Sequence, residues 1–167
     1  QRLSAQARAA TLTVLSGQAA RIAGHPAEVI CDTAGRHVGY VQDADGLAEI
    51  GGRRAWLTPD ICYRLYLIHR SGRAAGSSSG QAIAVLAHEA WHLHGERSEA
   101  RANCFAYQSG VQVGEALGLT ASTARRLMRE QLADNPVDFA ETPQYIVPSG
   151  CERGGSLDLQ LDGDHFP

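Results

Sequence analysis

The segment 81–94, QAIAVLAHEAWHLH, constrains the fold more than any other part of this sequence. It is apolar on nearly every side as far as His88, a pattern that indicates a helix buried among other elements. Gly95 follows it and predicts a C-terminal cap, because glycine readily adopts the left-handed conformation that ends many helices. We therefore expect this helix to lie inside a larger helical half of the protein.

Other elements are expected on both sides of this helix. Helical spacing marks 4–23, 61–69, about 97–117 and about 121–133. Short β-type runs, bounded by turn residues, occupy 28–31, 37–42 and 53–57. Thr58 and Pro59 predict a helix start, with the threonine as N-cap and the proline at the first helical position.

This order predicts an α+β fold. A chain of 167 residues suits a single domain with its own core. We expect an N-terminal helix in 1–24, a small antiparallel sheet of about three strands in 27–58, a helical half in 59–133 and an irregular tail in 134–167.

The bulk composition excludes several classes of function. Hydrophobic residues make up 44% of the chain, which is typical of a globular domain and not of a disordered one. The net charge of -3 gives no electrostatic case for nucleic acid or an acidic membrane surface as a partner. No run of about 18 apolar residues exists, so we expect no membrane span within the chain. The first residues show no signal peptide, which leaves open an anchor upstream of Gln1.

Four cysteines, at 31, 62, 104 and 151, contain no CxxC pair. This spacing argues against a zinc ribbon or a thioredoxin-type redox pair, and favours two disulfides in an oxidising compartment over buried thiols. Three connectivities are open. We favour Cys31–Cys62 with Cys104–Cys151, because each bridge would tie a nearby element to the core and the second would fasten the irregular tail.

The residues His88, Glu89 and His92 form an HExxH motif in the buried helix. Positions i and i+4 lie about 40° apart on a helix, so both imidazoles can reach one metal ion. Glu89 is rotated by about 100° from His88 and can approach a water molecule without binding the metal itself. The motif predicts zinc as the cofactor and Glu89 as a general base.

A third protein ligand is required, and four residues after the motif compete for this role: His94, Glu96, Ser98 and Glu99. His94 is turned about 200° away from the motif face. Glu96 follows Gly95 directly and would have to fold back sharply. Ser98 occupies the place of the third histidine in HExxHxxGxxH enzymes and lacks the ligand chemistry. Glu99 falls in the first turn of the next helix and is the predicted ligand.

The helix that begins at Glu99 has a face suited to close packing. The residues on that face are small or short: Ala102, Asn103, Ala106 and Gly110. Asn103 lies one turn beyond Glu99 and could hydrogen-bond a metal ligand or be a polar residue of the helix packing. Tyr107 could reach an oxyanion, but a position in the core or at an interface is favoured. If Glu99 is not a ligand, Asp134 and Asp138 become the candidates.

The stretch HEAWHLHGERSEARANCFA resembles the HExxH plus downstream glutamate pattern of gluzincin-like metallopeptidases. It is especially similar to a short form, HExxHxxGxxxEaxAxCxA, of predicted actinobacterial-type, membrane-linked proteins. The segment 151–159 looks like the C-terminal part of the same group. The resemblance covers about 81–107 specifically, and it implies a zinc ion, His88, His92 and Glu99 as ligands, and Glu89 as base.

Zinc-dependent peptide-bond hydrolysis is the predicted function, with a peptide or protein as the substrate. The run 53–57 could supply an edge strand that pairs with an extended peptide, or could be an ordinary hairpin strand. The alternative is a catalytically inactive, zinc-binding pseudo-peptidase that acts as a structural or protein-binding domain. The cysteines and the resemblance together predict an extracytoplasmic bacterial protein, either secreted or anchored at the outer face of a membrane.

Overall fold

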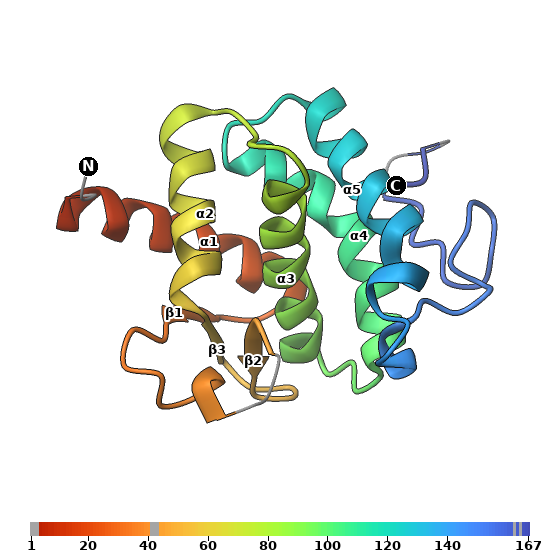
Figure 1. Cartoon of the computed structure of the whole chain (residues 1–167), viewed down its shortest axis with the longest axis horizontal. Coiled ribbons are helices and arrows are strands. Elements are labelled where there is room, and N and C mark those ends of the chain that lie inside the picture. The colour runs from red at the N-terminus through yellow and green to blue at the C-terminus, as the bar shows by residue number, and fades with distance from the viewer. Residues whose placement is uncertain (1–3, 41–43, 162, 164) are drawn as a thin grey trace.

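Helix α1, Ala5–Ala23, comes first in the computed structural model, and a three-stranded sheet and four more helices follow in its described part (Figure 1). The structure describes residues 4–40, 44–161, 163 and 165–167. This order confirms the predicted α+β class, the helix at the N-terminal side of the sheet and the helical half that follows the sheet.

The later helices are α2 (Pro59–Ser71), α3 (Ser77–His94), α4 (Glu99–Ala116) and α5 (Ala121–Asp138). The Thr58 hydroxyl caps α2 by accepting the N–H of Ile61 at 3.4 Å. Helix α3 starts at Ser77 and not at 81, because the Ser79 hydroxyl accepts the N–H of Ala75 at 2.7 Å and orders its first turn. Helix α5 continues past the predicted end at 133 and contains Pro136.

The sheet consists of β1 (Glu28–Cys31), β2 (Gly46–Ala48) and β3 (Arg54–Leu57), in the order β1-β3-β2. It is mixed, whereas antiparallel pairing was expected throughout: β3 is antiparallel to β2 but parallel to β1. The reason is the long connection after β1, which lets β2 return in the opposite direction, so that β3, after a short turn, runs along β1 again.

The prediction of a strand over 37–42 is wrong for the described residues. Val38–Tyr40 forms a 3-10 turn, and 41–42 lie outside the described residues. The Asp32 carboxylate accepts the N–H groups of Arg36, His37 and Val38 at 2.8–2.9 Å. These three bonds curve the backbone around the Asp32 side chain. The N–H groups of residues 36–38 are therefore not available for pairing with a neighbouring strand.

The prediction that 53–57 contains an edge strand is also wrong. Strand β3 takes up most of that run and lies at the centre of the sheet, with both of its sides paired. The edge position nearest the helical half belongs to β2, which packs against α3 (Figure 1).

Helix α3 lies at the centre of the molecule, in contact with the four other α-helices and with strands β2 and β3 (Figure 1). Its residues Ile83, Leu86 and Leu93 are fully buried in one hydrophobic cluster to which all five helices contribute. The small residues of α4 allow this packing: a methyl group added to Gly110 would collide with Met128 and lie 3.3 Å from Ile83. The helix that carries HExxH is therefore held from several sides.

Both predicted disulfide pairings, Cys31–Cys62 and Cys104–Cys151, are present. The first joins β1 to α2, and the second joins α4 to the C-terminal segment. Two disulfides fit an oxidising, extracytoplasmic environment. None of the described helices is long and apolar enough to cross a membrane.

Peptide mapping of protein purified without reductant should recover Cys31 linked to Cys62 and Cys104 linked to Cys151. By loop closure, bridges across 31 and 47 positions should each contribute about 4 kcal/mol to the free energy of unfolding. Recovery of four free thiols from such protein would contradict both the pairing and the oxidising compartment.

Candidate metal centre

Three side chains on α3 and α4 bring their ligand atoms together: His88, His92 and Glu99. The Nε2 atoms of the two histidines are 2.9 Å apart. Oε2 of Glu99 lies 2.8 Å from Nε2 of His88 and 3.1 Å from Nε2 of His92. Among the described residues this is the group of histidine, cysteine and acidic side chains that could hold a metal ion.

The turn after α3 explains why Glu99 arrives at this point. Gly95 adopts a φ of 112°, which favours glycine, and ends the helix. The N–H of Glu96 then donates to the carbonyl of Trp91 at 3.0 Å. Ser98 caps α4 through its hydroxyl, 3.2 Å from the N–H of Arg101. Glu99 consequently stands in the first turn of α4 and faces back to α3.

The competing ligands have other partners. Nδ1 of His94 lies 3.1 Å from the carbonyl of Ala23. The carboxylate of Glu96 accepts the N–H of Ser98 at 2.9 Å and pairs with Arg101 at 3.2 Å. Asp134 and Asp138 are exposed on α5, outside the cluster. The structure therefore brings together the three ligands that the sequence predicted and none of the alternatives.

The donor set suits zinc in size and chemistry. Zinc takes nitrogen and oxygen ligands at about 2.0–2.2 Å in tetrahedral geometry, which separates neighbouring ligand atoms by about 3.4 Å. The three separations here are 2.8–3.1 Å. Each separation would have to widen by about 0.3–0.6 Å to reach this value, through small movements of both imidazoles and of the Glu99 carboxylate.

Hydrogen bonds fix the tautomers of both histidines. Nδ2 of Asn103 donates to the carbonyl of Tyr145 at 2.8 Å, which turns Oδ1 of Asn103 toward Nδ1 of His88 at 2.7 Å. Nδ1 of His92 lies 2.6 Å from the carbonyl of Glu96. Because both acceptors are oxygens, each ring carries a proton on Nδ1. Each Nε2 lies within hydrogen-bond distance of Glu99 and would give up its own proton and offer a lone pair when a metal ion binds.

The electrostatics of the cluster favour a cation among these atoms. Burial opposes ionisation of Glu99, but hydrogen bonds from His88 and His92 outweigh it and lower the pKa of Glu99 to about 2. Burial likewise opposes the charged form of His92, yet its bonds to Glu99 and Glu96 raise the pKa of His92. An ionised carboxylate between two imidazoles thus attracts positive charge, whether a proton or a metal ion supplies it.

Glu89 lies beside this group and is not part of it. Only 6% of the residue is exposed, and no described residue makes a hydrogen bond to its carboxylate. Burial raises the pKa of Glu89, and the charges of His88 and His92 oppose this shift. The neighbour on the other side is Gly46 in β2, where a methyl group would lie only 2.7 Å from Cγ and Oε1 of Glu89.

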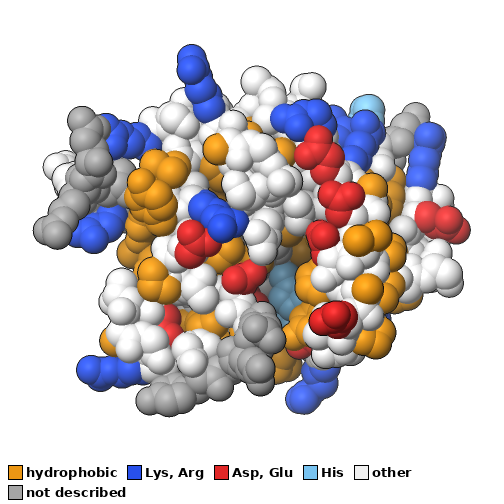
Figure 2. All heavy atoms as spheres, viewed as in Figure 1, with side chains coloured by type: hydrophobic (Ala, Val, Ile, Leu, Met, Phe, Trp, Pro, Cys, Tyr) orange, Lys and Arg blue, Asp and Glu red, His pale blue; other side chains and the backbone are white. Residues whose placement is uncertain are grey.

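The centre is open to solvent on one side. The side chain of His88 is 10% exposed and that of Glu99 is 34% exposed. In Figure 2 a histidine side chain is visible at the bottom of a depression near the middle of the face, with acidic side chains beside it. Solvent therefore reaches the His-His-Glu group from this side.

Two residues of the site were not predicted. The ring of Tyr145 lies 6.2 Å from that of His88, and Asn135 accompanies Asn103 in binding the Tyr145 carbonyl. Tyr107 has the core position that we favoured over a role at an oxyanion: it is 3% exposed and accepts a hydrogen bond from Asn135 at 2.9 Å. The tail that carries Tyr145 has no periodicity from which its position could be inferred.

Comparisons with protein-family models, with curated proteins and with solved structures find no match to this chain. The candidate metal centre therefore rests on its geometry alone. This geometry consists of a His-His-Glu group that could hold a metal ion and a buried glutamate, Glu89, next to it.

Proposed function

We propose that this protein is a zinc-dependent peptidase. The observation that carries the proposal is Glu89, a buried carboxylate next to the His-His-Glu group that makes no hydrogen bond within the described structure. Placing a carboxylate in a largely buried position without a hydrogen-bond partner in the protein costs stability, and carboxylates with such an environment are concentrated at functional sites. A purely structural metal site has no need for such a carboxylate.

Each residue has a distinct part in the proposed reaction. His88, His92 and Glu99 would hold the zinc ion, which would act as a Lewis acid and lower the pKa of water. Glu89 accepts the proton that the attacking water loses and delivers it to the leaving amine of the substrate. Its raised pKa suits this task, because the carboxyl has to keep the proton between the two transfers.

Strand β2 supports a peptide as the substrate. Backbone bonds join Thr58 to Asp45 and Glu49 to Arg54. In an antiparallel pair of strands, residues that hydrogen-bond to the partner strand alternate with residues that do not. Asp45 and Glu49 belong to the bonded set, so the N–H and C=O groups of Gly46 and Ala48 face away from β3. This free edge lies beside α3. An extended peptide that pairs with it would pass next to Glu89.

Turnover of a peptide library by zinc-loaded protein tests the proposal. We expect cleavage products by mass spectrometry, their loss on chelation and their return with added zinc. A protein that binds zinc stoichiometrically but cleaves no peptide would contradict it, and would favour an inactive, zinc-binding pseudo-peptidase. The two disulfides support assays in an oxidising buffer, in keeping with a proposed site of action outside the bacterial cytoplasm.

The substitution Gly46→Ala should reduce hydrolysis without loss of zinc. The added methyl group would lie 2.7 Å from Glu89, so that the carboxylate or β2 has to move. We expect kcat to fall by about 10–100-fold, the effect of a misplacement of about 1 Å. Gly17→Ala is the control, since a methyl group there meets no atom within 4 Å. Equal turnover in both variants would show that Gly46 does not position Glu89.

A further inference from the structure

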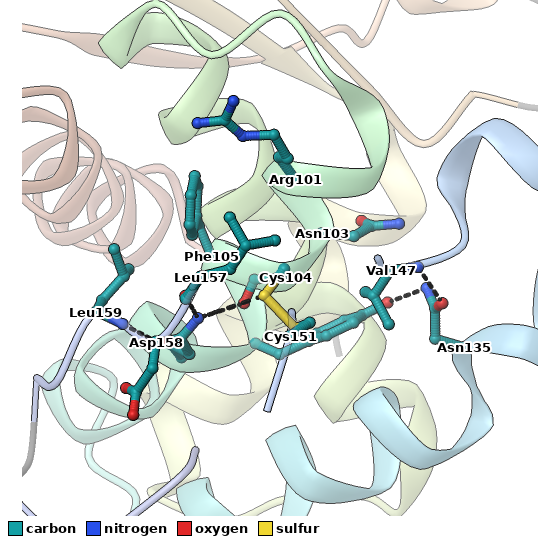
Figure 3. The surroundings of a disulfide bond; sticks show 12 residues. Arg101, Asn103, Cys104, Phe105, Asn135, Val147, Cys151, Leu157, Asp158 and Leu159 are labelled. Atoms are coloured by element: carbon teal, nitrogen blue, oxygen red, sulfur yellow. Dashed lines mark hydrogen bonds between the residues drawn. A yellow bond between two sulfur atoms is a disulfide. The ribbon is translucent and has the colours of Figure 1, made fainter. Parts of the chain in front are cut away.

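The C-terminal segment around Tyr145 reaches the side of the metal centre that faces away from the ligand atoms. The carbonyl of Tyr145 accepts two side-chain hydrogen bonds, from Asn103 on α4 at 2.8 Å and from Asn135 on α5 at 3.1 Å. Oδ1 of Asn135 accepts the N–H of Val147 at 2.9 Å. Figure 3 shows Asn103 and Asn135 approaching this segment from two different helices.

The direction of every bond in this chain of contacts is determined. The N–H of Val147 can only donate, so it orients the Asn135 amide with Oδ1 toward Val147 and Nδ2 toward Tyr145. The Tyr145 carbonyl can only accept, so it orients the Asn103 amide with Oδ1 toward His88. Two backbone groups of the tail thus specify that Nδ1 of His88 carries a proton.

Asn135 is well placed to hold this arrangement. It is fully buried, at 0% exposure. Its amide joins three elements, because it also donates to the hydroxyl of Tyr107 on α4 at 2.9 Å. It makes no contact with the His-His-Glu group itself and is separated from it by Tyr145 and Asn103. The hydrogen bonds that lead from Asn135 to His88 pass through Tyr145 and Asn103.

The segment has further attachments. The ring of Tyr145 stacks on Phe139 with the centroids 5.3 Å apart. The Cys104–Cys151 disulfide ties the chain to α4 one residue after Asn103 (Figure 3). Gln108, one turn later on α4, binds Leu157 and Leu159 at 2.9 and 2.7 Å. The irregular tail is thereby fixed along the same helix that carries Glu99 and Asn103.

We propose that Asn135 is a positioning residue for the metal centre: it holds the Tyr145 carbonyl, which orients Asn103, which keeps His88 in its metal-binding tautomer. This inference rests on the proposed metal site. The C-terminal tail is accordingly part of the metal-binding apparatus, although it supplies no ligand.

Zinc dissociation constants, measured by competition with a chromogenic chelator, test this chain of effects. Asn103→Ala should weaken zinc binding by about 10–100-fold, the range for a partner of a metal-bound histidine. Asn135→Ala should weaken it by about tenfold or more. The double variant should bind no more weakly than Asn103→Ala alone, because both changes break the same chain.

A spectroscopic signature distinguishes positioning from general damage. In the zinc-loaded parent protein, the Nδ1 proton of His88 should give a slowly exchanging downfield NMR signal. Asn135→Ala should broaden or shift this signal and leave that of His92, which binds the Glu96 carbonyl, unchanged. Thr11→Ala is the control: it removes a partly buried hydrogen bond between α1 and α2, to His69 at 2.8 Å, which involves no residue of the metal centre, and zinc affinity should not change.

If Asn135→Ala does not fold, a pair of disulfide variants replaces it. Cys104→Ser with Cys151→Ser releases the tail and should weaken zinc binding, whereas Cys31→Ser with Cys62→Ser should not. The proposal fails if a folded Asn135→Ala variant binds zinc as tightly as the parent protein does. It also fails if the losses of zinc affinity caused by Asn135→Ala and Asn103→Ala add fully in the double variant, or if the two disulfide variants bind zinc equally well. Absence of zinc binding in the parent protein would instead overturn the metal site itself.

Discussion

Replacement of Glu89 by glutamine should leave one zinc ion bound and reduce peptide hydrolysis by about a hundredfold or more, the contribution of a positioned general base. Glutamine keeps the size and polarity of the side chain in its place beside Gly46 but cannot accept a proton. Steady-state rates and metal content, measured on the same preparation, would give both numbers.

The control is Glu115→Gln, the same chemical change on an exposed residue of α4, which should alter neither quantity. A Glu89→Gln variant that cleaves a verified substrate at the parent rate would exclude Glu89 as the base. A variant that loses zinc would instead indicate that Glu89 helps to hold the metal.

Replacement of His92 by alanine should remove the metal. The residue is 4% exposed and would provide one of three ligand atoms, so the remaining pair would form an incomplete site. We expect zinc affinity to fall by more than about a hundredfold, the upper range for changes outside the ligand set. The parent protein should show a higher Tm with zinc than without it, and the variant should show no such difference.

His94→Ala offers a matched control two positions further along α3. Its ring faces Ala23 and Trp91, outside the ligand group, and its removal should leave the zinc content unchanged. Equal zinc content in the His92 and His94 variants would contradict the assignment of His92 as a ligand.

The grouping of His88, His92 and Glu99 could be predicted because its geometry is local. Helical periodicity places His88 and His92 on one face of α3, and a glycine after His94 ends that helix so that Glu99 enters the next one. Each step depends on neighbours within one or two turns. The disulfide pairs could also be predicted, since each joins an element to a segment that otherwise has few reasons to stay ordered.

The sheet and the tail depend on distant contacts, and there the sequence was less informative. No residue near 37–42 indicates that the Asp32 carboxylate accepts hydrogen bonds from the N–H groups of residues 36–38. β2 is only three residues long and carries no alternating pattern. Tyr145 reaches Asn103 across 42 positions, and a bond between a backbone carbonyl and a side-chain amide has no signature in the residue types.

The short distance along the chain between the ligands has a consequence for the order of folding. His88 and Glu99 are eleven positions apart, so the cost in loop-closure entropy of bringing them together is small, and α3 and α4 can meet early. The contact of Asn103 with Tyr145 closes a longer loop, across 42 positions, so we expect it to form later. We therefore expect a chain that folds in the presence of a metal ion to bind it first through the three predicted ligands, and the tail to pack behind His88 afterwards.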